Sequence, residues 1–200
     1  MSAEVRSREE ERRAMMPTPA QTIGPYFGFA LPWSDGREVV AEGTPGAIVL
    51  EGVLLDGAGQ PVPDGLIETW QADGDGRFAH PDDPRGAVAW SGFRGFGRCP
   101  TDAHGRYSIL TLKPGPVPGP GESTQAPHIT MSVFARGLLQ RLVTRVYFAD
   151  EQERNALDPV LCSLRGGEQM RRTLLAAPHD GGYCFDVRLQ GQDETVFFAI

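Results

Sequence analysis

The sequence is poor in cysteine and has no paired-cysteine motif. Its three cysteines, Cys99, Cys162 and Cys184, are odd in number and widely spaced, and no C-x-x-C pair is present. Such a pattern indicates neither a disulfide framework nor a zinc site. Because unpaired cysteine is usually buried, we expect buried free thiols in a cytoplasmic protein.

Long apolar runs and an excess of basic residues are also missing. No segment approaches the ~20 apolar residues of a membrane-spanning helix, and residues 1–16, dense in Arg and Glu, lack the apolar core of a secretory signal. The net charge of -7 argues against nucleic-acid binding, which relies on clustered Lys and Arg. We therefore expect neither a membrane nor a nucleic acid as partner.

Glycine and proline are abundant instead. The 25 glycines and 17 prolines are spread along 200 residues, a distribution typical of short strands joined by turns. Short helical turns are expected near residues 150–158 and 161–164. Apolar and alternating segments predict strands at 47–55, 66–71, 106–112, 128–136, 142–148, 183–190 and 195–198. The predicted fold is all-β, a two-layer β-sandwich of about eight strands with long loops and an extended N-terminal arm.

The sequence divides into three regions: a charged lead (1–16), the N-terminal arm (17–45) and a β-sandwich domain (46–200). Residues 17–29 hold three prolines and two glycines, which disfavour a helix. The aromatic residues of this arm must be buried, either against the arm's own domain or across a partner chain. Residues 78–97 have no period and predict a long irregular excursion, a kind of loop that is often functional.

The predicted strand at 128–136 carries an incomplete metal-binding pattern. Side chains alternate along a strand, so His128 and Thr130 share a face at a spacing that could place two ligands on one metal ion. The second residue is a threonine, however, and the Pro-rich loop before the strand offers only the hydrocarbon of Val117. This segment therefore has one side chain suited to a metal where two or three would be needed.

Seven short motifs occur in order over nearly the whole chain, and each alone is weakly specific. They are Thr22-x-Gly24-Pro25-Tyr26, Glu68-x-Trp70-Gln71-Ala72, Gly97-Arg98-Cys99-x-Thr101-Asp102, Gly105-Arg106-Tyr107, Lys113-Pro114-Gly115-Pro116, His128-Ile129 and Phe185-Asp186-x-x-Leu189-Gln190-Gly191. Together they resemble the intradiol ring-cleavage dioxygenases, and the combination is highly specific.

The resemblance implies how the metal positions are filled. Catalytic chains of this family hold a non-haem ferric ion with two tyrosines and two histidines, and phenolate is a hard anionic donor suited to Fe(III). The corresponding positions here are Arg85, Val117, His128 and Thr130, and the arginine that precedes the histidines corresponds to Gln125. One possible ligand in four cannot make a ferric site. The resemblance thus implies no metal and no catalytic residue in this chain.

The resemblance further implies that Fe(III) is carried by a homologous β subunit, in a higher-order α/β oligomer that cleaves a catechol acid with O2. This chain is then expected to contribute substrate-binding residues, namely Thr22, Gly24, Pro25 and Tyr26 of the arm and Arg136 at the strand end. Arg136 would meet the ring carboxylate, and the arm would exclude water. An ordinary interface ion pair at Arg136 and simple packing at Tyr26 are the alternatives.

Two other functions compete with this one. The turn patterns Asp56-x-x-Gly59-x-Pro61 and Asp102-x-x-Gly105-x-Tyr107 resemble those of transthyretin-like modules, which are non-enzymatic binding domains. Such modules need neither the arm motif nor the Lys113-Pro114-Gly115-Pro116 loop, so these two motifs favour the dioxygenase. A homo-oligomeric intradiol enzyme with an unusual ligand set is a third interpretation.

Overall fold

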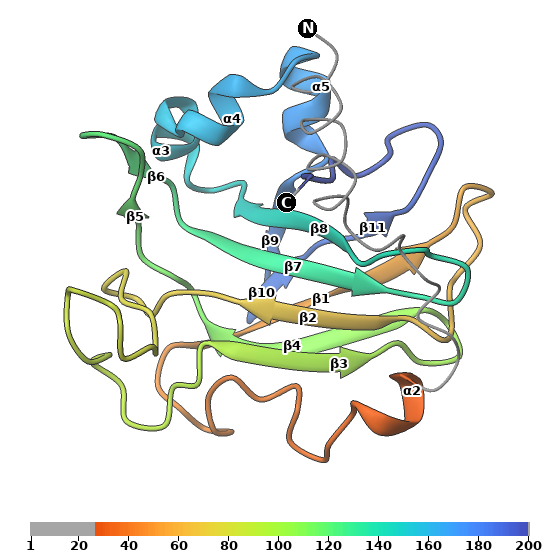
Figure 1. Ribbon diagram of the computed structural model, residues 1–200, viewed down its shortest axis with the longest axis horizontal. Helices are drawn as coiled ribbons and strands as arrows, with labels where there is room; N and C mark the ends of the chain where they lie inside the picture. Colours follow the sequence, from red (N-terminus) through yellow and green to blue (C-terminus); the bar gives the residue numbers. More distant parts are fainter. Residues whose placement is uncertain (1–26, 200) are drawn as a thin grey trace, which may run out of the picture.

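A computed structural model describes residues 27–199, so the charged lead and the arm through Tyr26 lie outside the described residues. Within that range no helix is long and apolar enough to cross a membrane. Four short helices are present (Figure 1): α2 (Phe27–Ala30), α3 (Gln152–Leu157), α4 (Pro159–Ser163) and α5 (Gly167–Arg172). The described residues also form eleven strands: β1 (Ala47–Leu55), β2 (Leu66–Trp70), β3 (Phe96–Pro100), β4 (Arg106–Leu112), β5 (Val117–Pro118), β6 (Thr124–Gln125), β7 (His128–Phe134), β8 (Leu142–Phe148), β9 (Leu175–His179), β10 (Gly182–Cys184) and β11 (Val187–Arg188).

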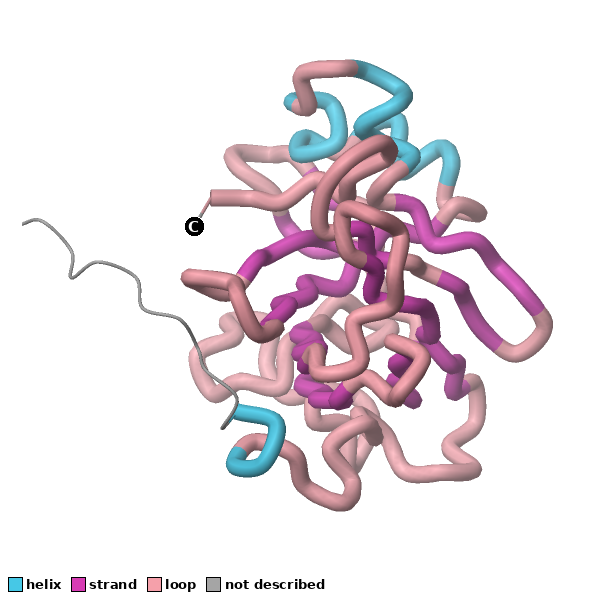
Figure 2. Tube along the Cα trace, turned by 90° about the vertical axis from the view of Figure 1, so that its right-hand side faces the viewer, coloured by secondary structure: helices cyan, strands magenta, loops and turns pink. Residues whose placement is uncertain are grey.

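Nine of these strands form one mixed sheet that folds over on itself. One half is the antiparallel run β3-β2-β7-β8, and the other half is built on β1, which pairs with β4, β10 and β11. Strand β9 joins the halves, because it pairs with both β8 and β10. The two halves lie as layers, with helices α3 to α5 at one end and α2 at the other (Figure 2). The all-β, two-layer prediction is confirmed.

The core lies between the layers and follows the strand alternation. On β7 the side chains of Ile129, Met131 and Val133 are fully buried, and they pack in one cluster with Leu50 and Leu54 of β1. A smaller cluster of Ala126, Tyr147, Leu161 and Leu174 lies beneath the helices. Ile129, Met131 and Val133 therefore form the inward face of β7, and the opposite face, which carries His128, is half-buried.

Local sequence signals located several elements well. The strands predicted at 47–55, 106–112 and 142–148 are confirmed at both ends, and those at 66–71 and 128–136 end one and two residues early. The helical turns expected in residues 150–164 are present as α3 and α4. Helix α4 begins after Asp158, whose carboxylate accepts hydrogen bonds from the N–H groups of Val160 and Leu161. Asp followed by Pro at the first helical position is a strong start signal.

The single strand predicted at 183–190 is wrong. The segment forms two short strands, β10 and β11, which pair in parallel with β1 on either side of an interruption at Phe185 and Asp186. There the Asp186 carboxylate, rather than a backbone carbonyl, accepts the hydrogen bond from the Val53 N–H at 2.9 Å. The side chain of Asp186 thus replaces a backbone acceptor at this point of the β1 pairing.

Three further expectations need correction. Residues 195–198 are extended but form no strand, because only isolated bonds such as Phe198 N–H to the Val143 carbonyl hold them. The excursion of 78–97 runs into β3, a strand whose partner β2 is distant in sequence. The end of the stretch 17–29 is helical in α2, where the Leu31 N–H donates to the Phe27 carbonyl.

Sequence periodicity did not predict β5, β6, β9 or α5, all of which are six residues or shorter.

The expectation of buried thiols holds for Cys99 and is wrong for the other two cysteines, which are exposed. All three are free.

Gly52, in the middle of β1, gives a test of how closely β1 packs against its neighbouring strands. A Cβ at this position would overlap the carbonyl group of Phe185 and press on the Tyr107 hydroxyl. We expect Gly52→Ala to lower the free energy of unfolding by about 1–3 kcal/mol, measured by urea denaturation. Gly28→Ala is the control, because its Cβ would meet nothing within 4 Å; equal stabilities of the two variants would contradict this packing.

Candidate functional site

The Pro-rich loop that follows β4 is fixed at its start by Lys113. The Lys113 ammonium lies 2.8 Å from a carboxylate oxygen of Asp150 and 2.8 Å from one of Glu151, and above the rings of Phe148 and Tyr183. Further along, the Gly115 N–H donates to the Asp73 carbonyl at 2.8 Å. The loop that carries Val117 is therefore held against both the end of β8 and the turn after β2.

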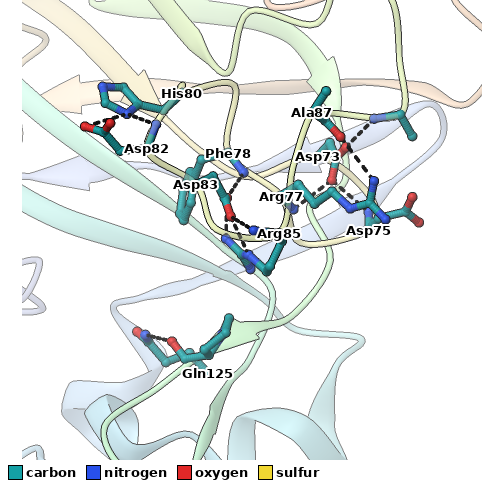
Figure 3. A network of polar contacts seen from close by, with 12 residues as sticks. Asp73, Asp75, Arg77, Phe78, His80, Asp82, Asp83, Arg85, Ala87 and Gln125 are labelled. Atoms are coloured by element: carbon teal, nitrogen blue, oxygen red, sulfur yellow. Dashed lines mark hydrogen bonds and ion pairs between the residues drawn. The ribbon is translucent and has the colours of Figure 1, made fainter.

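The turn after β2 is organised by the buried carboxylate of Asp73 (Figure 3). This side chain is fully buried and accepts hydrogen bonds from the N–H groups of Asp75, Arg77 and Ala89. Arg77 adds a bond from its guanidinium to the Ala87 carbonyl. The Asp73 carboxylate thus ties the turn after β2 to Ala89 in the excursion.

Arg85 lies in this excursion and is paired with a neighbouring acid. Its Nε and Nη2 donate to the two carboxylate oxygens of Asp83 at 2.8 and 2.6 Å, and its guanidinium lies over the Phe78 ring (Figure 3). The Arg85 guanidinium and the backbone N–H of Phe78 lower the pKa of the Asp83 carboxyl far below its usual range. Where the family has a tyrosine ligand, this chain has a cation committed to a structural ion pair.

His128, at the start of β7, is a neutral, hydrogen-bonded side chain. Its Nδ1 lies 2.8 Å from the Ala126 carbonyl oxygen, which can only accept, so Nδ1 carries the proton. The ring packs beside Tyr147, its partner across the β7–β8 ladder. Burial and the nearby Arg145 cation lower the pKa of His128 to about 4. One ring nitrogen is thus already used by the protein.

The remaining positions converge on Arg145 of β8. Thr130 is its cross-strand partner, and the Arg145 guanidinium donates to the Gln125 side-chain oxygen at 2.6 Å and to the Tyr147 hydroxyl at 3.3 Å. Gln125 in turn pairs with Val117 in the β5–β6 ladder. The fold therefore brings Val117, Thr130 and Gln125 together, with His128 next to them on β7.

Asp158, the residue before α4, completes this network. Its carboxylate accepts bonds from the Tyr147 hydroxyl at 3.2 Å and the Ala126 N–H at 2.8 Å, besides those of the α4 N-terminus. It thereby fixes the backbone two residues before His128. Neither Asp158 nor Arg145 was singled out from the sequence; the Asp-Pro start signal could have identified the first, whereas nothing local identifies the second.

These residues do not fit a ferric ion. Fe(III) prefers anionic oxygen and imidazole donors, and the four corresponding positions supply a paired guanidinium, a hydrocarbon, a hydroxyl and one imidazole. Within residues 27–199, no group of three or more His, Cys, Asp or Glu side chains could hold a metal ion. What this region offers chemically is a hydrogen-bonded network of neutral polar groups with one cation, Arg145, and one carboxylate, Asp158.

A second feature lies at the other end of β7. Arg136 follows the strand and its side chain is 64% exposed; its Nε donates to the carboxylate of Asp64. The two residues line a pocket of about 310 Å³ together with Phe27, Gly28, Gly65 and Thr101. Phe27 directly follows the arm motif, whose residues Thr22, Gly24, Pro25 and Tyr26 lie outside the described residues. Their role in binding stays a prediction.

The fold and the sequence together define a class of protein. A family model described as "Dioxygenase" matches residues 23–191, and the chain belongs to the intradiol dioxygenase family. It is 43% identical to the protocatechuate 3,4-dioxygenase alpha chain of Burkholderia cepacia, over 92% of this chain and 97% of that protein.

Two further similarities extend this comparison. It is 40% identical to the protocatechuate 3,4-dioxygenase beta chain of Burkholderia cepacia, over 74% of this chain and 66% of that protein. A solved dioxygenase domain from Streptomyces sp. SirexAA-E is 27% identical, with a TM-score of 0.54 over 88% of this chain and 99% of that one. Membership of this family decides against the transthyretin-like module.

The buried, neutral state of His128 predicts a pH dependence of stability. Its pKa is about 4 in the folded chain and about 6.5 when unfolded, so the unfolded state binds the extra proton first. We expect the wild-type free energy of unfolding to fall as pH drops from 6.5 to 4. The fall should exceed that of His128→Gln by up to about 3 kcal/mol, and protonation of His128 should cause no further loss of stability below pH 4.

The measurement is urea denaturation across this pH range. His104→Gln, at an exposed turn position, is the matched control and should keep the wild-type profile. Parallel profiles for wild type and His128→Gln would show that His128 is not held neutral.

Proposed function

We propose that this chain is an α-type subunit of a protocatechuate 3,4-dioxygenase, paired with a homologous β chain that carries the ferric ion, in an oligomer of such pairs. The observation that carries the proposal is the difference between the two ends of β7. At its start the family's ligand positions hold side chains unsuited to iron, whereas beyond its end Arg136 lines a pocket with the residue that follows the arm. The free cysteines fit a cytoplasmic location.

The reaction proposed for the complex is cleavage of protocatechuate by O2 between the two carbons that bear hydroxyl groups, giving 3-carboxy-cis,cis-muconate. One ring C–C bond breaks, and both oxygen atoms of O2 enter the product. The partner's ferric ion supplies the activation of the bound catechol toward O2. This chain's contribution is to bind, to orient and to exclude water.

Arg136 is the residue proposed to meet the substrate carboxylate. Protocatechuate carries this carboxylate on the side of the ring away from the catechol oxygens, so a group outside the iron site must bind it. A guanidinium forms charge-assisted, often bidentate bonds to carboxylate. The arm residues Thr22, Gly24, Pro25 and Tyr26 are proposed to line the same pocket, which is supported by the position of Phe27 beside Arg136.

Iron content gives the first test of the α-type assignment. Purified alone, the chain should hold no stoichiometric iron and show no oxygen uptake with protocatechuate, because three of its four ligand positions offer no suitable donor. Co-purified with a β chain, it should give an active complex with one iron per β chain, measured by metal analysis and oxygen consumption. A lone chain with one bound iron and dioxygenase activity would instead support a homo-oligomeric enzyme with an unusual ligand set.

Substitution of Arg136 tests the binding role. In the complex, Arg136→Ala should raise KM for protocatechuate roughly 10- to 100-fold, since a hydrogen bond to a charged group contributes about 1.5–3 kcal/mol. Turnover of catechol, which lacks the carboxylate, should change little. Arg141→Ala, an exposed arginine of the same β7–β8 connection, is the control. If KM for protocatechuate were unchanged, Arg136 would be an ordinary interface residue.

A further inference from the structure

The β2–β7 ladder places an acid directly opposite Arg136. Leu66 pairs with Phe134 at the end of this antiparallel ladder. Continuing the register two residues further brings Asp64 opposite Arg136, and there the Arg136 Nε donates to the Asp64 carboxylate. The contact therefore follows from strand register and is more than a chance meeting of two long side chains.

The backbone that carries Asp64 is fixed on both sides. The buried hydroxyl of Thr101 accepts from the Gly65 N–H at 2.8 Å and donates to the Val62 carbonyl at 2.7 Å, and the Thr101 N–H donates to the Gly65 carbonyl at 2.9 Å. Gly65 is also closely packed, because a Cβ there would overlap the Leu54 side chain. Asp64 thus projects from a rigid turn.

Arg136, in contrast, has little else to restrain it. Its side chain is 64% exposed, and Asp64 is the partner that the described residues give it. Because the acid engages Nε, the two terminal nitrogens stay available, and these can bind a second carboxylate bidentately. A long side chain already held in one orientation loses less conformational freedom when it binds.

We infer that Asp64 is a positioning residue, which holds Arg136 by its Nε so that the terminal guanidinium nitrogens meet the substrate carboxylate. The inference rests on the proposed function and deepens it. Asp64 also carries a negative charge that opposes an anionic substrate. The Asp64 side chain is one-third exposed, so solvent screens its repulsion of the substrate carboxylate. Solvent does not reduce the benefit of holding Arg136 in one orientation, so positioning outweighs repulsion.

The test compares four variants of the α/β complex: Asp64→Ala, Asp64→Asn, Arg136→Ala and the double variant Asp64→Ala/Arg136→Ala. The measurements are KM and kcat for protocatechuate and for catechol, together with the dissociation constant of protocatechuate from anaerobic titration. Glu168→Gln, which removes one charge of an exposed ion pair on α5, is the control. It should leave every constant unchanged.

Asp64→Ala should raise KM and the dissociation constant for protocatechuate about 2- to 10-fold, with kcat and the catechol constants unchanged. Asp64→Asn keeps an oxygen that accepts from Nε, so it should restore wild-type binding or tighten it. In the Arg136→Ala background, Asp64→Ala should have no further effect.

The inference is overturned if Asp64→Ala binds protocatechuate equally or more tightly, if Asp64→Asn is as weak as Asp64→Ala, or if Asp64→Ala weakens binding without Arg136. Failure of the proposed function has a different signature. In that case Arg136→Ala itself leaves the binding of protocatechuate unchanged.

Discussion

The position of β7 between β2 and β8 is the constraint on which the rest of the molecule depends. Both ladders are antiparallel and in continuous register, so every residue of β7 has a fixed neighbour on at least one side, and residues 130–133 have one on both. The buried faces of Ile129, Met131 and Val133 lock that register, because a slip of one residue would turn them to the outer face. The same register then decides which polar residues meet at the two ends of the strand.

At the start of β7 the register produces a polar network that needs no metal. Thr130 meets Arg145, and His128 meets Tyr147, while Asp158 and the Ala126 carbonyl satisfy the remaining groups. The Ala126 carbonyl engages Nδ1 of His128, and the Arg145 guanidinium engages the Gln125 side chain. The start of the strand is therefore a satisfied hydrogen-bond network around Arg145, at a place where unsatisfied polar groups would be costly.

Beyond the end of β7 the same register places Arg136 and Asp64 together at a pocket. Asp64 and Arg136 extend the β2–β7 pairing past the last backbone bond, and they reach the pocket that Phe27 also lines. The strand is thus structural at one end and available for binding at the other.

The sequence predicted what is local and failed where partners are distant. Apolar or alternating runs located the strands from Ala47, Arg106 and Leu142, because that pattern lies within each segment itself. The break at Asp186 could not be predicted, since it depends on the Val53 N–H far away in the sequence. The short strand β3 was missed for the same reason.

In the candidate site, too, residues with a local signal were predicted and residues that depend on distant partners were not. The resemblance located Arg85, Val117, His128 and Thr130, and strand alternation placed Arg136 on the face of His128. Asp64 was identified only as part of a turn, because its partner is known only once the β2–β7 register is known. Arg145 likewise needs the β7–β8 register.

The central claim is that β7 has given up metal binding at its start and serves a partner's substrate beyond its end. A crystal structure of the α/β complex with protocatechuate bound tests it most directly. The account predicts the substrate carboxylate within hydrogen-bond distance of the terminal nitrogens of Arg136, Asp64 on Nε, and no metal beside His128. A carboxylate bound by other residues, or an iron ion coordinated by His128, would contradict it.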